Sequence, residues 1–143
     1  MALQKITPFL WFDNQAAEAA QFYTTVFPNS KLVSTNPVVS VFELEGLQIS
    51  AMNGGPMFKL TEAFSFTINC ETQAEIDYYW EKLTEGGEES MCGWLKDKFG
   101  LSWQVVPTVL SQLMNDPVKA PKAMKAFMTM KKFNIEELTN AAL

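Results

Sequence analysis

The sequence predicts an α+β fold in which two βαβββ modules form a cupped mixed sheet, followed by a helical C-terminal tail. A strand-like apolar run followed by an amphipathic helix occurs twice, and three short strand patterns follow each helix. Residues 45–52 match residues 99–106 position for position in pattern, which indicates an internal duplication with a period of about 54 to 58 residues. Beyond Pro107 the pattern is helical only.

Length and composition favour one globular domain. The chain has 143 residues, of which 48% are apolar, enough for a well-buried core. We expect a single domain over residues 1–143, with module one at about 5–53, module two at about 63–107 and C-terminal helices at about 108–142.

Charge and residue usage exclude several classes of function. A net charge of −5 without a strong basic patch argues against nucleic-acid binding, and no apolar run is long enough for a membrane span. Without a signal-peptide pattern we expect a cytoplasmic protein, with Cys70 and Cys92 as buried thiols. The chain has no histidine, so histidine-based catalysis and histidine-ligated metals are excluded.

The first module is predicted from its apolar runs and turns. Residues 6–12 form a strand with Pro8 near its start, and Asp13 and Asn14 can cap a helix over about 14–26. Strands follow at about 31–34, 38–44 and 47–52, the last two joined by a tight turn at Glu45-Gly46.

The second module repeats this order. Residues 63–70 read as a strand, and a Thr72–Glu75 capping box opens a helix with a buried apolar stripe. Two short strands then fold about a turn between residues 92 and 107, where Asp97 reads as part of a solvated hairpin edge. The tail predicts helices at 108–114, 117–130 and 135–142, with methionines expected to pack against the domain or a second subunit: Met114, Met124, Met128 and Met130.

Strand alternation predicts which side chains line the cleft. If Gln104 faces inward, the residues that share its face are Thr7, Phe9, Trp11, Gln48, Ser50, Met52, Ala63, Ser65, Thr67, Ser102 and Val106. The opposite face, which would pack under the helices, carries Leu10, Phe12, Phe64, Phe66, Ile68 and Trp103. A site of aromatics, methionine and neutral polar groups suits an organic, partly flat ligand.

Several motifs together resemble one known family. They are residues 7–12, Phe22-Tyr23, residues 53–56, Gly93-Trp94-Leu95 and residues 99–104. This combination resembles the PhnB-like branch of the vicinal oxygen chelate superfamily, which includes glyoxalases, bleomycin-resistance proteins and extradiol dioxygenases. The resemblance extends from residue 5 to about residue 132. Some members of this branch carry a demethylubiquinone methyltransferase label.

The resemblance implies a cleft between the two modules that commonly holds a divalent metal. The ligand positions fall on Thr7, Ser50, Ala63 and Gln104, and none of these is an imidazole or a carboxylate. Met57 stands where relatives often have a histidine. We therefore expect that the metal has been lost and that the protein needs no cofactor.

These observations lead to one main hypothesis and three alternatives. We expect a metal-free, homodimeric small-molecule-binding protein that holds an apolar or aromatic compound through Phe9, Trp11, Ser50, Met52, Ser65, Trp94 and Gln104, with no catalytic residue assigned. The alternatives are a lyase, isomerase or dioxygenase with an unconventional metal site, a methyltransferase as the label suggests, and a structural dimerisation module with a closed cleft. The cleft could be assembled within one chain or by exchange of halves between two.

Overall fold

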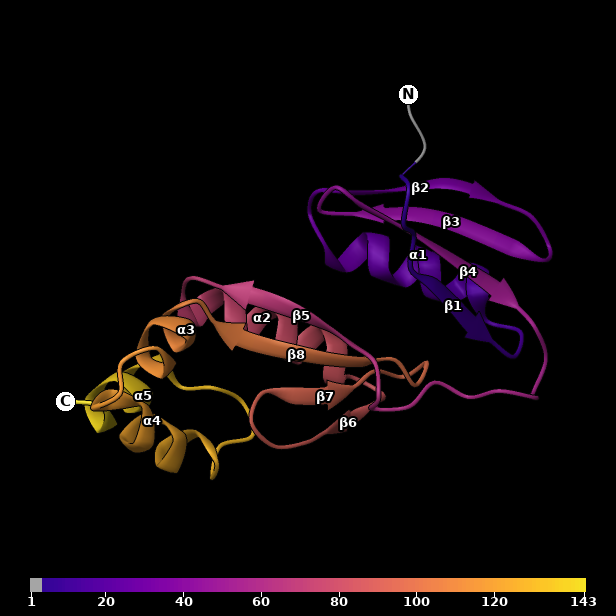
Figure 1. The fold of residues 1–143 in the computed structure, drawn as a ribbon. Coiled ribbons are helices and arrows are strands. Elements are labelled where there is room, and N and C mark those ends of the chain that lie inside the picture. The colour runs from indigo at the N-terminus through magenta and orange to yellow at the C-terminus, as the bar shows by residue number, and fades with distance from the viewer. Residues whose placement is uncertain (1–3) are drawn as a thin grey trace. The chain divides into compact units, whose positions relative to one another are not determined.

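The computed structural model describes residues 4–143 as two compact units, which divide between Leu60 and Thr61 (Figure 1). The elements of the first unit are β1 (Phe9–Phe12), α1 (Ala16–Val26), β2 (Ser30–Thr35), β3 (Val39–Leu44) and β4 (Leu47–Asn53). Those of the second are β5 (Ser65–Cys70), α2 (Gln73–Thr84), β6 (Glu88–Glu89), β7 (Trp94–Lys96) and β8 (Ser102–Pro107), followed by α3 (Val109–Met114), α4 (Lys119–Phe127) and α5 (Ile135–Ala141).

The two sheets have the same topology. The strand order is β1-β4-β3-β2 in the first and β5-β8-β7-β6 in the second, and each outer first strand runs parallel to the last strand of its module. The remaining pairs are antiparallel. The predicted duplication of a βαβββ module and the helical tail are therefore confirmed.

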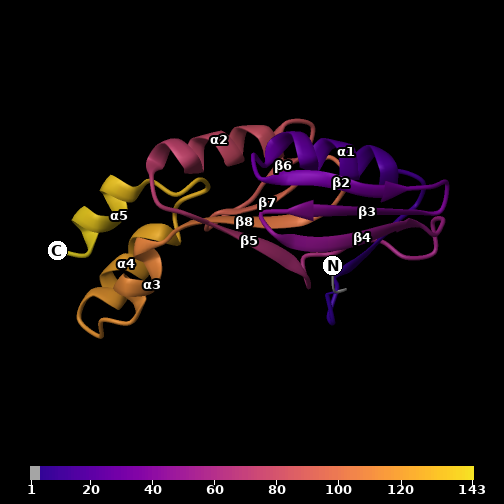
Figure 2. The same ribbon diagram turned by 90° about the horizontal axis from the view of Figure 1, so that it is seen from above.

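One helix covers one face of each sheet (Figure 2). Beneath α1, the buried side chains include Leu10, Phe12 and Phe42, and the centroid of the Phe42 ring lies 5.9 Å from that of Tyr23 on the helix. Beneath α2, the core includes Leu95, Trp103 and Val105, together with the predicted helix stripe of Ile76, Tyr79, Trp80 and Leu83. The alternation in β1, β4 and β8 is thus confirmed. Phe64 was wrongly expected in this core, because it precedes β5 and is exposed.

β1 is shorter than predicted because the Gln4 side chain, and not the backbone before Phe9, makes the hydrogen bonds to Gln48 of β4. The Gln4 amide donates from Nε2 to the carbonyl of Gln48 at 3.0 Å and accepts from the Gln48 N–H at 3.2 Å. Pro8 has no N–H to contribute to a ladder. Thr7 consequently lies before the strand, with its Oγ1 3.4 Å from the Gln4 carbonyl oxygen.

The two main helices begin differently. Thr72 caps α2 as predicted, because its Oγ1 accepts from the Glu75 N–H, and Glu75 accepts in turn from the Glu71 N–H. The prediction for α1 was wrong: neither Asp13 nor Asn14 caps it. Instead Asn53 Oδ1, at the end of β4, accepts from the Ala16 N–H at 2.8 Å.

Asp97 is buried, with 3% of its surface exposed, so its prediction as a solvated edge residue was wrong. Oδ1 accepts from the N–H groups of Phe99 and Leu101 at 2.9 and 3.1 Å. Oδ2 accepts from the indole Nε1 of Trp103 at 2.8 Å. The buried carboxylate therefore stabilises the β7–β8 turn through these hydrogen bonds. The alternating charges of Lys96, Asp97 and Lys98 in the sequence did not indicate this role.

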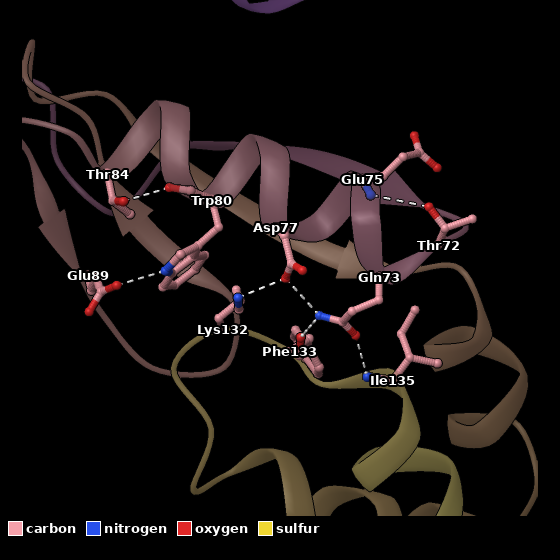
Figure 3. Close-up of polar contacts among 10 residues, drawn as sticks. All are labelled: Thr72, Gln73, Glu75, Asp77, Trp80, Thr84, Glu89, Lys132, Phe133 and Ile135. Atoms are coloured by element: carbon pink, nitrogen blue, oxygen red, sulfur yellow. Dashed lines mark hydrogen bonds and ion pairs between the residues drawn. The ribbon is translucent and has the colours of Figure 1, made fainter.

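The three tail helices pack on one another in sequence, α3 against α4 and α4 against α5. Residues 130–135, which we call the strap, fasten the tail to α2 (Figure 3). Gln73 donates to the Phe133 carbonyl and accepts from the Ile135 N–H at 2.9 and 2.8 Å, and Lys132 pairs with Asp77 at 2.7 Å.

The strap also pairs with the turn before β7. The N–H groups of Cys92 and Gly93 donate to the carbonyls of Met130 and Lys131. The Phe133 ring lies so close to Gly93 that a β-carbon there would be 2.6 Å from it. Met130 is buried as expected, whereas Met124 and Met128 are exposed on this chain, so for these two only packing against a second subunit stays a prediction. Cys92 is half-buried, so its prediction as a buried thiol was wrong. Of residues 4–143, no helix has both the length and the hydropathy needed to span a membrane.

Candidate functional site: the sheet faces left uncovered by the helices

The uncovered face of the first sheet brings together four predicted site residues. Phe9 pairs with Ser50 and Trp11 with Met52 across the parallel β1–β4 ladder, and Cα partners present their side chains to the same face. Phe9 is 57% exposed, and the other three are half-buried. An exposed phenyl ring next to a hydroxyl, an indole and a thioether makes this face mainly apolar.

Trp11 is held in place by the segment that follows β4. Its Nε1 donates to the Gly55 carbonyl at 2.9 Å, and its ring makes an edge contact with Phe58 at 5.0 Å between centroids. Gly54 lies against the indole, so a β-carbon there would be 2.3 Å from Trp11 Cε2. Gly54-Gly55, which the sequence predicts as the end of the strand pattern, therefore packs against the Trp11 indole and fixes its position.

The uncovered face of the second sheet brings together the other three predicted residues. Gln104 pairs with Trp94 across the β7–β8 ladder, and its Nε2 donates to Ser65 Oγ at 3.0 Å. Ala63 lies in the turn before β5, so the β5 side chain that reaches Gln104 is Ser65. The structure thus forms two groups of predicted residues, one on each sheet; their binding role stays a prediction.

A cavity of about 470 Å³ opens on the second unit, within the range typical of ligand pockets. Its lining includes Trp94, Lys96 and Ser102, which share the uncovered face of β7 and β8. The remaining lining residues are Glu62, Glu88, Glu89, Leu95 and the turn at residues 90–92. Of these only Trp94 and Ser102 were among the predicted cleft residues.

Lys96 is the cation of this cavity. Its ammonium forms an ion pair with the Glu62 carboxylate, and that hydrogen bond raises the pKa of Lys96 and lowers the pKa of Glu62. The pair is open to solvent, with 33% and 65% of the two side chains exposed. Lys96 therefore carries its charge at neutral pH and is not a candidate general base.

Of the two residues in this ion pair, only Lys96 could have been placed in the cavity from the sequence. Lys96 lies directly opposite Ser102 in the ladder, which follows once the residues of the β7–β8 turn are known. Glu62 comes from the segment before β5 and had no such signal.

The donor set of the uncovered faces does not fit a divalent metal ion. The positions at which the resemblance places ligands hold the hydroxyls of Thr7 and Ser50, the methyl of Ala63 and the amide of Gln104. Within residues 4–143, no three histidine, cysteine, aspartate or glutamate side chains form a cluster that could hold a metal ion. Histidine nitrogens and carboxylates are the donors such ions prefer.

The cysteine thiols differ in environment. Burial raises the pKa of the Cys70 thiol to about 12, so it is protonated and unreactive at neutral pH. Cys92 is half-buried at the cavity wall, 4.0 Å from the sulfur of Met128.

Comparisons with known proteins agree with this architecture. The family model described as 3-demethylubiquinone-9 3-methyltransferase matches residues 4–106, so α3, α4 and α5 lie beyond the match. A putative 3-demethylubiquinone-9 3-methyltransferase, PhnB protein, from Bacillus cereus is 33% identical, with a TM-score of 0.68. The alignment covers 73% of this chain and 100% of that one.

Two more distant structures share the fold alone. PA1353 from Pseudomonas aeruginosa is 21% identical with a TM-score of 0.59, covering 74% of this chain and 98% of that one. The fosfomycin resistance protein FosX from Listeria monocytogenes, solved with Mn(II) and sulfate, is 16% identical with a TM-score of 0.60, covering 80% and 98%.

No functionally curated protein matches the chain. The family model nevertheless spans more than half of the sequence, and the Bacillus cereus protein is aligned over its whole length. The chain therefore belongs to the PhnB, or 3-demethylubiquinone-9 3-methyltransferase, family, which is built on the glyoxalase/bleomycin-resistance fold.

Proposed function

We propose that the protein binds an apolar or aromatic small molecule, without a metal ion, on the sheet faces that its helices leave uncovered. The observation that carries the proposal is the exposed Phe9 beside Trp11 and Met52 on one sheet, on a face that offers apolar surface and neutral polar groups. Trp94, Gln104 and Ser65 offer the same chemistry on the other sheet. Such a surface provides stacking and hydrogen bonds and no obvious proton shuttle.

Native mass spectrometry of the purified protein tests the proposal directly. We expect a retained organic compound, or binding of added aromatic compounds, and no stoichiometric divalent metal by elemental analysis. A stoichiometric metal ion would contradict the metal-free part of the proposal. Turnover that chelators abolish would favour an enzyme of the superfamily instead.

Substitutions separate the proposed surface from nonspecific adsorption. Phe9→Ala and Trp94→Ala should each weaken binding of an aromatic compound, measured by isothermal titration calorimetry, by about tenfold because each removes a large contact surface. Met124→Ala is the matched control, since it truncates an exposed apolar side chain on the tail helix α4. Equal losses in all three variants would contradict the assignment of this surface.

The family description names a methyltransferase, which the local structure does not favour. A methyltransferase of the usual kind binds its nucleoside cofactor at a glycine-rich turn that opens a helix. Here Gly54-Gly55-Pro56 follows β4, but no helix lies between residues 54 and 64. We expect no binding of S-adenosylmethionine in calorimetry, and micromolar binding would favour the methyltransferase alternative.

A further inference from the structure

The cavity on the second unit contains a buried hydroxyl that has no partner. Ser102 is 1% exposed, and within residues 4–143 its Oγ is the one buried side-chain nitrogen or oxygen atom without a hydrogen bond. An unsatisfied buried hydroxyl costs free energy, so a native structure normally gives it a partner or a role. Ser102 is one of the residues that line the cavity.

The neighbour of Ser102 is the cavity's cation. Lys96 is its direct partner across the β7–β8 ladder, so both side chains start from the same face with β-carbons about 5 Å apart. Two residues with donor groups, Lys96 and Ser102, are therefore adjacent in the wall of a cavity of about 470 Å³ that Trp94 also lines.

A carboxylate of the chain already occupies one of these donors. Glu62 precedes β5, and its exposed side chain forms the ion pair with Lys96. An ion pair this open to solvent contributes little stability, so an incoming anion can replace Glu62 at small cost. Glu62 thus shows which chemical group the ammonium accepts.

We propose that this cavity binds an aromatic carboxylate, whose carboxylate replaces Glu62 at Lys96 and accepts a hydrogen bond from Ser102 while its ring lies against Trp94. The inference rests on the proposed function and names the class of its ligand. An oxyanion satisfies both donors at once, and charge-assisted hydrogen bonds are the strong ones. The cavity is also lined by the carboxylates of Glu62, Glu88 and Glu89, so a ligand ammonium is the competing class that the test includes.

Three compounds of equal size and different charge provide the test: 2-naphthoate, 2-naphthamide and 2-naphthylmethylamine. By isothermal titration calorimetry at neutral pH, we expect 2-naphthoate to bind about tenfold more tightly than the amide and the amine to bind most weakly. Lys96→Met should abolish the preference for the acid over the amide.

Two further variants test the displacement and the hydroxyl. Glu62→Gln should increase the affinity for 2-naphthoate several-fold, because it removes the competing carboxylate, whereas Glu81→Gln, at an exposed position of α2, should not. Ser102→Ala should weaken 2-naphthoate binding several-fold without lowering the unfolding temperature, since no hydrogen bond within the protein is lost.

The outcomes distinguish this inference from the proposed function. Equal affinity for all three compounds, or tighter binding of the amine, would overturn the aromatic-carboxylate inference and leave the proposed binding of aromatic compounds intact. If none of the three binds, both proposals fail for this class of aromatic compound.

Discussion

Asp97 shows how one side chain can organise a hairpin from inside the protein. Its two oxygens accept three hydrogen bonds, from two backbone N–H groups of its own turn and from the indole of Trp103. A buried carboxylate is expensive unless it is satisfied in this way. Because β7 and β8 carry Lys96 and Ser102, the geometry of the cavity depends on this turn.

Asp97→Asn should therefore destabilise the protein by about 1–3 kcal/mol. The amide keeps one acceptor oxygen but places an N–H₂ group against another N–H donor. Urea denaturation measures the loss, and Asp13→Asn, the same change at an exposed position, should cost far less. Equal midpoints for the two variants would contradict this role of Asp97.

Gly93 is a second residue whose role depends on its surroundings. Its φ is +80°, and a β-carbon would lie 2.7 Å from the Val105 carbonyl oxygen as well as against the Phe133 ring. Gly93→Ala should lower the unfolding temperature more than Gly46→Ala, which has a φ of +86° and no atom within 4 Å of the added carbon. The comparison separates the clash from backbone strain, and equal shifts would show that strain alone matters.

At the scale of elements, helix ends and the strap are held by residues distant in sequence. Asn53 caps α1 from the end of β4, and Gln73 at the start of α2 bonds both sides of the strap. These contacts connect elements that have little local preference for each other. The strap in turn supports the turn at residues 91–93, and part of this turn lines the cavity.

Docking of the strap should depend on pH through Asp77. Lys132 and then Gln73 lower the pKa of Asp77 below its ordinary value of 3.8. The ionised carboxylate therefore stabilises the docked strap above about pH 4, and this contribution is lost as the pH falls through the lowered pKa. Because the pair is about half exposed, the effect should stay under about 1 kcal/mol and weaken with salt.

Amide hydrogen exchange measures this dependence at Ile135, whose N–H bonds to Gln73. Its protection factor should fall below pH 4 in the native protein and vary little with pH in Asp77→Asn. Asp116→Asn is the control, because the pKa of Asp116 is lowered by backbone N–H groups at the start of α4 and not by the strap. The same pH dependence in all three proteins would contradict a role for Asp77.

At the scale of the whole molecule, exposed apolar side chains suggest association. They include Leu32 and Val33 on the outer strand β2, together with Phe9, Met57 and Phe58. Large apolar side chains exposed on a monomer are often buried in an interface between subunits when they lie together. We propose that the protein forms a homodimer.

Sedimentation equilibrium at micromolar concentration checks the homodimer. The expected mass is twice the 16.1 kDa of one chain. Particles of 16.1 kDa alone would contradict the proposal.

The residues that sequence could place are those governed by local rules. Alternation in β1 and β8 put Phe9 and Gln104 on one kind of face and Leu10 and Trp103 on the other, because successive strand residues point to opposite sides. The Thr72–Glu75 box marked the start of α2 through side-chain bonds only three residues apart.

Sequence by itself determined the duplicated βαβββ modules, the helical tail, the family and the neutral character of the predicted ligand-binding residues, because periodicity and residue type are local properties of the chain. Only the tertiary structure decided that Asp97 is buried, that Asn53 caps α1, and that Glu62 meets Lys96 beside an unpartnered Ser102. These features depend on strand register and on which distant segment approaches a side chain. Both are set by packing in three dimensions and leave no periodic trace in the sequence.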